Sequence, residues 1–422
     1  MTAAGPALRV DEAFALEQDA ADPLASQRQR FHIPVGPDGS PRVYLAGQSL
    51  GAQPRAARDA LETELDAWAT LGVEGHFHEG AAWVSYDEPL REPTARLVGA
   101  LPDEVATMNT LTVNLHLLMA SFFRPSGNRD KILIDAPTFP SDRYAVESQL
   151  RHHGLDPAEH LIVVGPRQGE ATVRTDDLEA AIHDQRDRLA VALLAGVNYA
   201  TGQVLDIPRL TTAIHRAGAL AGWQLAHSAG NVLLSLHDWD VDFAMWCTYK
   251  YLCGGPGSIA QIFVNRRHGS DPNVPRLSGW WGNAAASRFR MAETFEPGAG
   301  ADGWRLSNPP ILALAPVRAS LAIFDEVGMT ALRTKSLRLT PYLAGLIDAV
   351  GGVEIITPRD PAAHGCQLSL RLPEARARLD RLEAAGIVAD FREPDIIRVA
   401  PVPMYNTFHD AWRFAQALSE TA

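Results

Sequence analysis

The sequence predicts an α/β protein with a mainly parallel sheet in a large domain, followed by a smaller α+β domain at the C-terminal end. From about residue 95 to 265, apolar strand candidates alternate with helical segments, as in strand–helix–strand units. The strand candidates are apolar throughout rather than alternating, so we expect helices to cover both faces of the sheet. Beyond residue 311, long helices are followed by isolated strands, which is typical of an α+β arrangement.

Local patterns predict the individual elements. An N-terminal helix is expected within residues 12–31, before the turn PVGPDGSP, and an amphipathic helix over 54–71. The strands expected in the sheet are 131–135, 161–165, 191–197, 221–227, 242–249 and 259–265. The helices expected between them include 141–152, 175–184 and 207–217, the last capped by Gly218. The tail is expected to contain two helices within 311–350 with a cap at Gly328, a strand at 367–372, a helix at 373–385 and a strand at 396–401.

These elements divide the chain into three expected parts. Residues 1–45 form an N-terminal arm, residues 46–310 a large domain and residues 311–422 a small domain. A length of 422 residues is sufficient for two domains with an appendage.

Composition excludes several function classes. The net charge of −12 argues against nucleic-acid binding, which needs clustered basic side chains. No apolar run approaches the roughly 20 residues that span a bilayer, so no membrane association is expected. The acidic, Ala-rich start does not resemble a signal peptide. Three cysteines suggest neither a disulfide framework nor a metal site, and we expect a cytoplasmic protein without a metal.

Lysine is unusually rare in this chain. Only Lys131, Lys250 and Lys335 occur among 38 basic residues. A guanidinium stays protonated and cannot act as an amine nucleophile, so a lysine retained in an apolar setting is a candidate for amine chemistry. Lys131 and Lys335 are expected to be solvated ends of elements. Lys250 lies between a buried strand and a Gly-rich turn, and it is the candidate.

Two segments offer polar groups to the carboxyl edge of the sheet, the usual binding crevice of open α/β folds. In residues 108–119, Thr110 and Thr112 begin a helix, and a helix N-terminus binds anions. Simple capping by Asn109 or Thr110 is the alternative. In residues 136–142, Phe139 offers an aromatic face and Asp142 an acid, although an ordinary loop with an Asp helix cap is also consistent with this segment.

Three further segments complete the predicted site. His227 and Gln224 end a buried strand, although a lone His there also fits a satisfied core residue. The Lys250 amine, next to Tyr249, can form a Schiff base with a carbonyl cofactor, because burial lowers a lysine pKa readily. Arg398 stands alone in an apolar strand, where its partner is either a substrate carboxylate or an internal acid.

Taken in this order on this sheet, the residues match the layout of a fold-type I pyridoxal phosphate (PLP) enzyme. Such a site needs a phosphate cradle, an aromatic stacked on the pyridine ring, an acid facing the ring, a Schiff-base lysine and a late arginine for the substrate carboxylate. The sequence therefore predicts PLP as cofactor and an amino acid as small-molecule substrate.

The sequence also closely resembles kynureninase over nearly its whole length. The resemblance is carried by several blocks in order: RFHIP (30–34), YLAGQSLG (44–51), LTVNLHLLM (111–119), FPSD (139–142), LHDWDVDFA (236–244), CTYKYL (247–252), SNPPIL (307–312), GCQL (365–368) and IRVAPVPMYNTFHD (397–410).

The resemblance implies roles for individual residues. Lys250 would be the Schiff-base lysine, and Lys250 and Tyr249 would be the catalytic residues. The implied cofactor-binding residues are Leu111, Thr112, Phe139, Ser141, Asp142, Gln224, His227, Tyr249, Lys250, Trp280 and Asn308. The implied substrate-binding residues are His76, Asn308 and Arg398. Trp280 and Asn308 match family positions that reach the site of a neighbouring subunit, so the resemblance implies a homodimer with shared active sites.

Two positions depart from the family pattern. Gln224 stands where the family normally has an acid that pairs with the pyridine N–H of PLP. A neutral amide can hydrogen-bond this nitrogen but supplies no counter-charge, so the ring would be a weaker electron sink. No other acid in the matched blocks obviously takes this role. Asn283 stands where a histidine is expected.

The implied activity is hydrolysis of L-kynurenine, or its 3-hydroxy form, to an anthranilate and L-alanine, in the kynurenine pathway of tryptophan catabolism and NAD biosynthesis. One alternative is a kynureninase-like enzyme whose reaction or substrate has changed because of Gln224. Another is a homologue that binds PLP or a partner without turnover. The lysine, the aromatic and the arginine occur together, which argues against this last reading.

Overall fold

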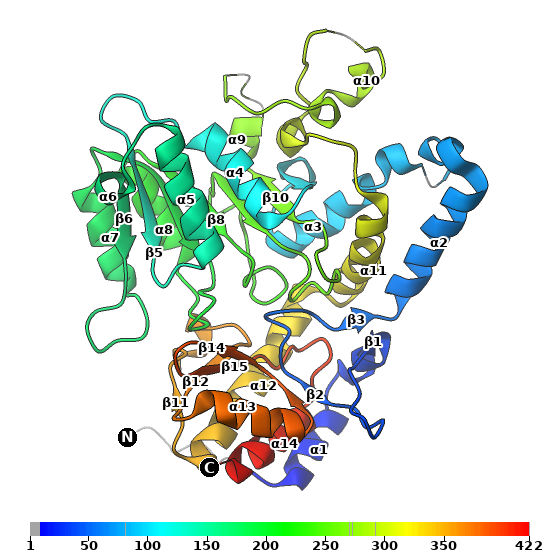
Figure 1. Ribbon diagram of the computed structural model, residues 1–422, viewed down its shortest axis with the longest axis vertical. Helices are drawn as coiled ribbons and strands as arrows, with labels where there is room; N and C mark the ends of the chain where they lie inside the picture. Colours follow the sequence, from blue (N-terminus) through cyan, green and yellow to red (C-terminus); the bar gives the residue numbers. More distant parts are fainter. Residues whose placement is uncertain (1–8, 81, 270, 272, 292, 422) are drawn as a thin grey trace.

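The computed structural model describes residues 9–80, 82–269, 271, 273–291 and 293–421. Its large domain is built on a seven-stranded sheet with the order β4-β10-β9-β8-β7-β5-β6 (Figure 1). The strands are β4 (Val105–Thr107), β5 (Lys131–Asp135), β6 (Leu161–Val164), β7 (Leu189–Ala195), β8 (Leu220–Gln224), β9 (Phe243–Trp246) and β10 (Gln261–Val264).

The expected mainly parallel sheet is confirmed. Strands β5 to β9 pair in parallel, and only β10 runs antiparallel to its neighbours β9 and β4. Successive side chains of β5 enter different core clusters: Ile132 and Ile134 pack on one face, whereas Leu133 packs on the other. Because both faces are buried, the strands need apolar residues at every position.

Helices follow the strands closely. The helices of the large domain are α2 (Ala56–Leu71), α3 (Arg91–Val98), α4 (Leu111–Phe122), α5 (Pro140–His152), α6 (Pro157–His160), α7 (Thr175–Asp184), α8 (Ile207–Arg216), α9 (Arg266–Gly269), α10 (Ala285–Arg288) and α11 (Ile311–Val327). Gly218 follows α8 at a φ of 72°, a left-handed conformation that favours glycine, as the predicted cap requires.

The small domain contains a four-stranded antiparallel sheet in the order β11-β12-β15-β14. Its strands are β11 (Glu354–Ile355), β12 (Leu368–Arg371), β14 (Asp390–Arg392) and β15 (Ile396–Val399), and its helices are α12 (Met329–Val350), α13 (Ala375–Ala384) and α14 (Phe408–Glu420). The expected boundary at residue 311 falls at the start of α11, which packs against α2 and α3 of the large domain, whereas α12 packs against α14 (Figure 1). The division at 46–310 and 311–422 stays a proposal.

The N-terminal arm joins the small domain. Its helix α1 (Glu12–Ala20) packs on α14, and β2 (Val43–Tyr44) pairs in parallel with β13 (Ile387–Val388). A second short pair in the arm joins β1 (Phe31–His32) to β3 (Gln53–Pro54). The helix expected over 12–31 is shorter than predicted, because Pro23 restricts the preceding residue and ends the helical path before a 3-10 turn at Ala25–Arg30. Residues 1–8 of the expected arm lie outside the described residues.

One lysine is placed differently from the prediction. Lys335 is not a solvated element end: it is 4 % exposed in α12, and its Nζ lies 2.7 Å from a carboxylate oxygen of the equally buried Asp22. Local sequence gave no sign of this partner, because Asp22 belongs to the arm. Lys131 is partly buried, and its amine donates to the side-chain oxygen of Gln185.

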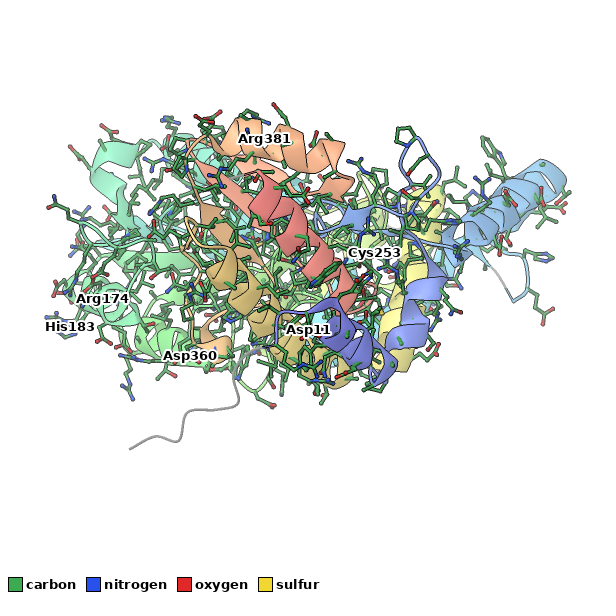
Figure 2. All side chains as sticks on the ribbon, turned by 90° about the horizontal axis from the view of Figure 1, so that it is seen from below. Asp11, Arg174, His183, Cys253, Asp360 and Arg381 are labelled. Atoms are coloured by element: carbon green, nitrogen blue, oxygen red, sulfur yellow. The ribbon has the colours of Figure 1, made fainter. Side chains whose placement is uncertain are left out.

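The outer surface is charged, and the described cysteines are internal. Figure 2 shows Arg174, His183 and Arg381 at the rim of the molecule, whereas Cys253 is 1 % exposed. Cys247, Cys253 and Cys366 are all free and buried. Among the described helices, we find no segment that combines the length and apolarity needed to cross a membrane.

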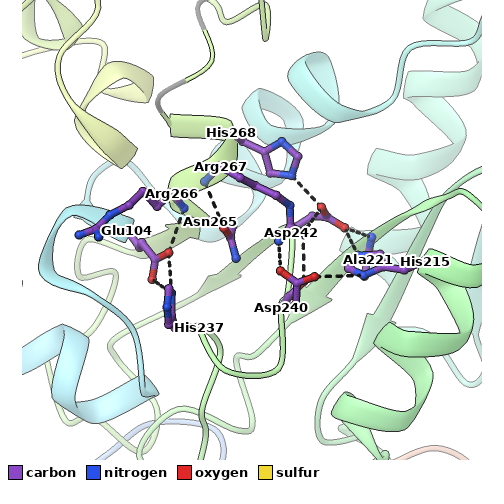
Figure 3. Close-up of polar contacts among 10 residues, drawn as sticks. All are labelled: Glu104, His215, Ala221, His237, Asp240, Asp242, Asn265, Arg266, Arg267 and His268. Atoms are coloured by element: carbon purple, nitrogen blue, oxygen red, sulfur yellow. Dashed lines mark hydrogen bonds and ion pairs between the residues drawn. The ribbon is translucent and has the colours of Figure 1, made fainter.

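A charged cluster joins the amino ends of β8 and β9 to the segment that follows the antiparallel strand β10 (Figure 3). Asp242, just before β9, accepts hydrogen bonds from the Nε2 atoms of His215 and His268, from Arg267 and from the backbone N–H of Ala221. Burial alone would raise the pKa of Asp242. The hydrogen bonds from the two histidines and the charge of Arg267 outweigh burial and hold this pKa well below its usual range.

Asp242→Asn is expected to lower the free energy of unfolding by about 2 kcal/mol near pH 7, because it removes the charge that these donors share. Since the pKa of Asp242 is lowered in the folded protein, this stabilisation exists above the unfolded value of about 4 and is lost as the pH falls through the folded pKa. Thermal unfolding of both proteins in a pH series should show the gap in Tm narrowing below about pH 4.

Asp240→Asn is the matched control. Asp240 also binds Arg267, but its side chain is 63 % exposed, so this substitution should change Tm little. Equal decreases in Tm in the two variants would contradict the role assigned to Asp242. A difference in Tm between wild type and Asp242→Asn that does not change with pH would also contradict it.

Candidate active site

The candidate site lies where the strand order of the sheet reverses. β5 lies between β6 and β7, so the chain leaves β5 toward one side and later returns on the other. Such a switch point opens a crevice at the carboxyl ends of the strands. A cavity occupies this place, and the residues that line it include Asp135, Phe139, Asp142, Tyr199, Gln224 and His227.

Phe139 and Asp142 reach the cavity from the loop after β5 and the first turn of α5. Phe139 is 38 % exposed, and its ring meets the ring of Tyr199 edge-on at 5.2 Å between centroids. Asp142 does not cap α5, because Phe139 occupies the cap position and the Asp142 carboxylate points to another strand. The helix-cap alternative for Asp142 is therefore wrong.

Asp142 and Gln224 contact each other inside the cavity. The Gln224 amide Nε2 donates to Asp142 Oδ2 at 2.9 Å, and Gln224 Oε1 accepts the backbone N–H of Ala226 at 2.9 Å. Both side chains are buried. Burial raises the pKa of Asp142 to about 6, against the opposing effects of the Gln224 hydrogen bond and the Lys250 charge.

Lys250 and His227 form a second polar contact. Lys250 Nζ lies 2.9 Å from His227 Nε2 and 5.8 Å from the centroid of the Phe139 ring. Burial lowers the pKa of the Lys250 amine, and the nearby charge of Arg398 acts in the same direction. Burial also lowers the pKa of His227 well below its usual range, which favours the neutral imidazole. Lys250 is thus a partly buried amine of lowered basicity beside an imidazole that favours its neutral form.

The Lys250 turn is held by close backbone packing. The strand expected to reach residue 249 ends at Trp246, because Thr248 leaves the sheet and its Oγ donates to the backbone oxygen of Ile259. Gly51 N–H donates to the Tyr249 oxygen at 2.9 Å. A Cβ atom at Gly51 would lie 2.3 Å from the Lys250 oxygen, so only glycine fits this approach.

Two helix N-termini meet at the expected phosphate cradle. Leu111 and Thr112 begin α4, and Ser141 lies in the first turn of α5. The Thr112 and Ser141 hydroxyls are 2.7 Å apart. Thr110 precedes α4 without a side-chain hydrogen bond to the helix, so the simple capping alternative fails for Thr110. Free N–H groups and hydroxyls at two helix starts suit an anion.

Arg398 reaches the site from β15 of the small domain. It is 1 % exposed, donates through Nε to Asp390 Oδ1 at 2.7 Å and through Nη2 to Asp390 Oδ2, and donates through Nη1 to the backbone oxygen of Tyr199 at 2.6 Å. An internal acid therefore does pair with this arginine. Three of its five N–H groups are used in these bonds, and the other two have no hydrogen-bond partner among the described residues.

Three predicted residues make their described contacts away from Lys250. Trp280 is 48 % exposed and donates to the backbone oxygen of Arg288, and Asn308 is exposed. His76 meets the ring of Trp83 edge-on in the segment after α2. Asn283 donates to the Ser287 hydroxyl, next to Trp280. A single chain does not bring these residues to Lys250.

Sequence reasoning missed several residues around the cavity. Asp135 ends β5 and accepts hydrogen bonds from the Ala195 N–H and from Asn198, and burial raises its pKa to about 6. Its position at the carboxyl end of a strand was a usable signal. Asp390 had none, because its link to Arg398 arises only when β14 pairs with β15.

Solved structures show which fold the chain has. A cysteine desulfurase from Escherichia coli aligns with a TM-score of 0.77 at 17 % identity, covering 94 % of this chain and 98 % of that one. A variant of the protein C-DES, with glycine covalently linked to its PLP cofactor, aligns with a TM-score of 0.76 at 15 % identity, covering 93 % and 98 %. With a partly buried lysine beside the switch point, the chain has the fold of a fold-type I enzyme.

Sequence relatives give the family. The protein named kynureninase from Salinispora tropica is 53 % identical over 97 % of both chains, and the family model for the kynureninase C-terminal domain matches residues 332–418. The chain belongs to the kynureninase family.

Proposed function

We propose that this protein is a PLP-dependent hydrolase that cleaves L-kynurenine, or 3-hydroxy-L-kynurenine, in tryptophan catabolism. The observation that carries the proposal is the partly buried Lys250 amine, 2.9 Å from His227, beside the switch point of a kynureninase-family chain. In the reaction, water adds across the bond between Cβ and the side-chain carbonyl carbon. The hydroxyl goes to the carbonyl carbon, which becomes the carboxyl of anthranilate, and a proton goes to the carbon that becomes the alanine methyl.

The residues of the cavity fit PLP. Two buried polar atoms, Asp142 Oδ1 and His227 Nδ1, have no hydrogen-bond partner within the described part of the chain, which favours a polar ligand between them. Leu111, Thr112, Ser141 and Tyr249 would hold the phosphate, Phe139 would stack on the ring, and Lys250 would attach the aldehyde. When bound, the cofactor would draw electrons from the substrate Cα.

The chain's own groups supply binding and proton transfer. The two free N–H groups of Arg398 suit a substrate carboxylate, because guanidinium and carboxylate bind in a bidentate manner. Lys250 is the base that takes and returns the Cα proton, since burial lowers the pKa of its amine toward the range of a general base. His227 Nε2 holds the amine in place.

The direct test is turnover by purified, PLP-loaded protein. Anthranilate fluorescence should rise with L-kynurenine, and absorbance should report 3-hydroxykynurenine in parallel, with L-alanine formed in equal amount. A protein that holds PLP and releases neither product would reject the proposed reaction. Gln224→Asp tests the alternative of a retuned enzyme: a large gain in kynurenine cleavage would support that alternative, which no observation on the described residues favours.

We also propose a cytoplasmic homodimer with shared active sites. Its support is a cluster of three exposed aromatic side chains. Phe77 is 65 % exposed, Phe289 49 % and Trp280 48 %, and the Phe289 ring lies 5.5 Å from that of Phe77 and 5.4 Å from that of Trp280, between centroids. Exposed apolar side chains gathered in this way are typical of an interface. The buried thiols are consistent with a reducing compartment, and a role in NAD biosynthesis would follow from the pathway.

Mixing two inactive variants tests shared sites. In a hybrid of a Lys250→Ala subunit with a Trp280→Ala subunit, one site receives an intact lysine and an intact tryptophan. Random exchange should therefore restore about a quarter of the wild-type activity, measured after mixing under conditions that allow subunit exchange. If Trp280 acts only in its own subunit, no hybrid site is complete and activity stays at the level of the separate variants.

A further inference from the structure

The contact between Gln224 and Asp142 gives a structural role to Gln224, the residue that replaces the acid usual in the family. Gln224 uses Nε2 to hold Asp142 Oδ2 at 2.9 Å and Oε1 to accept the Ala226 N–H at 2.9 Å. The amide is therefore engaged on both of its polar atoms by the protein itself. It behaves as a support for the neighbouring carboxylate.

Asp142 has one oxygen left for a ligand. Its Oδ1 is buried and has no hydrogen-bond partner within the described part of the chain, whereas Oδ2 is held by Gln224. A buried acceptor without a donor is unfavourable, so this atom is suited to a donor that arrives with a ligand. The protonated pyridine nitrogen of PLP is a cationic N–H donor, and only a carboxylate supplies both acceptor and counter-charge.

We propose that Asp142 is the acid that pairs with the pyridine nitrogen of PLP in this chain, and that Gln224 is the positioning residue that orients Asp142. This inference rests on the cofactor of the proposed function. The pyridinium ring would then keep a negative counter-charge, supplied by Asp142, although Gln224 replaces the usual acid. The cleavage reaction needs no other adjustment at residue 224.

The charges around Asp142 agree with this role. Lys250 is the nearby cation and Asp135 the nearby anion, and burial raises the pKa of Asp142 to about 6. A pyridinium beside the carboxylate would lower this pKa and, by reciprocity, raise that of the pyridine nitrogen. Asp135 is less suited to the nitrogen, because both of its oxygens already accept a hydrogen bond, whereas Asp142 Oδ1 accepts none within the described part of the chain.

The test is the protonation state of bound, ¹⁵N-labelled PLP, read from its nitrogen chemical shift, together with the Kd of the cofactor. Wild-type protein should show the pyridinium shift near neutral pH. Asp142→Asn, which is nearly the same size, should show the neutral pyridine shift and a Kd raised roughly tenfold or more, because a charge pair is lost. Gln224→Leu should give an intermediate protonation, since the carboxylate stays but loses its orienting N–H.

Asp135→Asn is the matched control. It also removes a buried carboxyl from the same cavity, yet it should leave the nitrogen protonated. Circular dichroism of each variant checks the fold, and Gln224→Leu serves if Asp142→Asn does not fold. Gln224→Asp should raise kynurenine cleavage by less than about tenfold, because the counter-charge is already present.

Two results would overturn the inference. One is a pyridinium that persists in Asp142→Asn, and the other is a neutral nitrogen in the wild-type protein. These outcomes are separate from the proposed reaction: a wild-type protein with a pyridinium that depends on Asp142 but no kynurenine turnover supports the inference and rejects the reaction. A wild-type protein that binds no PLP overturns both.

Discussion

Lys250→Ala is expected to abolish covalent attachment of PLP and to lower kcat by about 10³-fold or more, because one amine both attaches the cofactor and moves the Cα proton. The loss is measured by anthranilate release and by the disappearance of the visible absorption of the lysine-bound cofactor. Normal turnover by Lys250→Ala without an added amine would contradict the assignment.

The scarcity of lysine makes the attachment site easy to identify. Borohydride reduction of the loaded protein, followed by peptide mass spectrometry, should place the cofactor on the peptide that contains Lys250, and not on Lys131 or Lys335. Lys131→Arg is the matched control: it keeps the charge at a partly buried strand end and should change neither colour nor rate. Label on either of the other two lysines would refute the role of Lys250.

Arg398→Ala is expected to lower kcat/KM by about 10²- to 10³-fold, mainly through KM, because truncation removes the bidentate partner of the substrate carboxylate. Arg398→Lys should recover only part of this loss, since a single ammonium cannot reproduce the planar fork. Steady-state kinetics with L-kynurenine and with its decarboxylated analogue measure the effect. The analogue lacks the carboxylate, so wild-type and variant proteins should treat it alike.

Asp390→Asn separates binding from positioning at this arginine. Asp390 holds Arg398 through two hydrogen bonds and also accepts one from Arg392. Loss of its charge should leave the arginine fork free but less well oriented, so kcat/KM should fall less than in Arg398→Ala. An equal fall in both variants would show that the arginine acts through Asp390 and not on the substrate.

Much of the large domain was predictable because its signals are local. Fully apolar runs marked β7 and β9, and an apolar run between Lys131 and Asp135 marked β5; the structure places all three in the expected parallel sheet. Lys250 stood out by its rarity and by its place after an apolar strand. What failed was also local in origin: the turn at Thr248 ended β9 early, and Pro23 shortened α1.

Contacts between distant segments were beyond the reach of the sequence. The sequence predicted a solvated Lys335, whereas in the structure the N-terminal arm places Asp22 beside its amine. For Arg398 the sequence allowed either a substrate carboxylate or an internal acid, and the structure shows Asp390 of β14 as an internal partner. In the sequence, Gln224 replaces the acid that the family normally has at this position. The fold places it against Asp142, which lies 82 residues earlier in the chain.

The sequence by itself determined the fold class, the family resemblance and the reactive lysine, because apolar periodicity and residue type are written along the chain. Only the tertiary structure decided which charges meet: Asp142 with Gln224, Asp390 with Arg398, and Lys250 with His227. The physical reason is that a buried polar group is stabilised by its partner in space, and the separation of these partners along the chain carries no local signal.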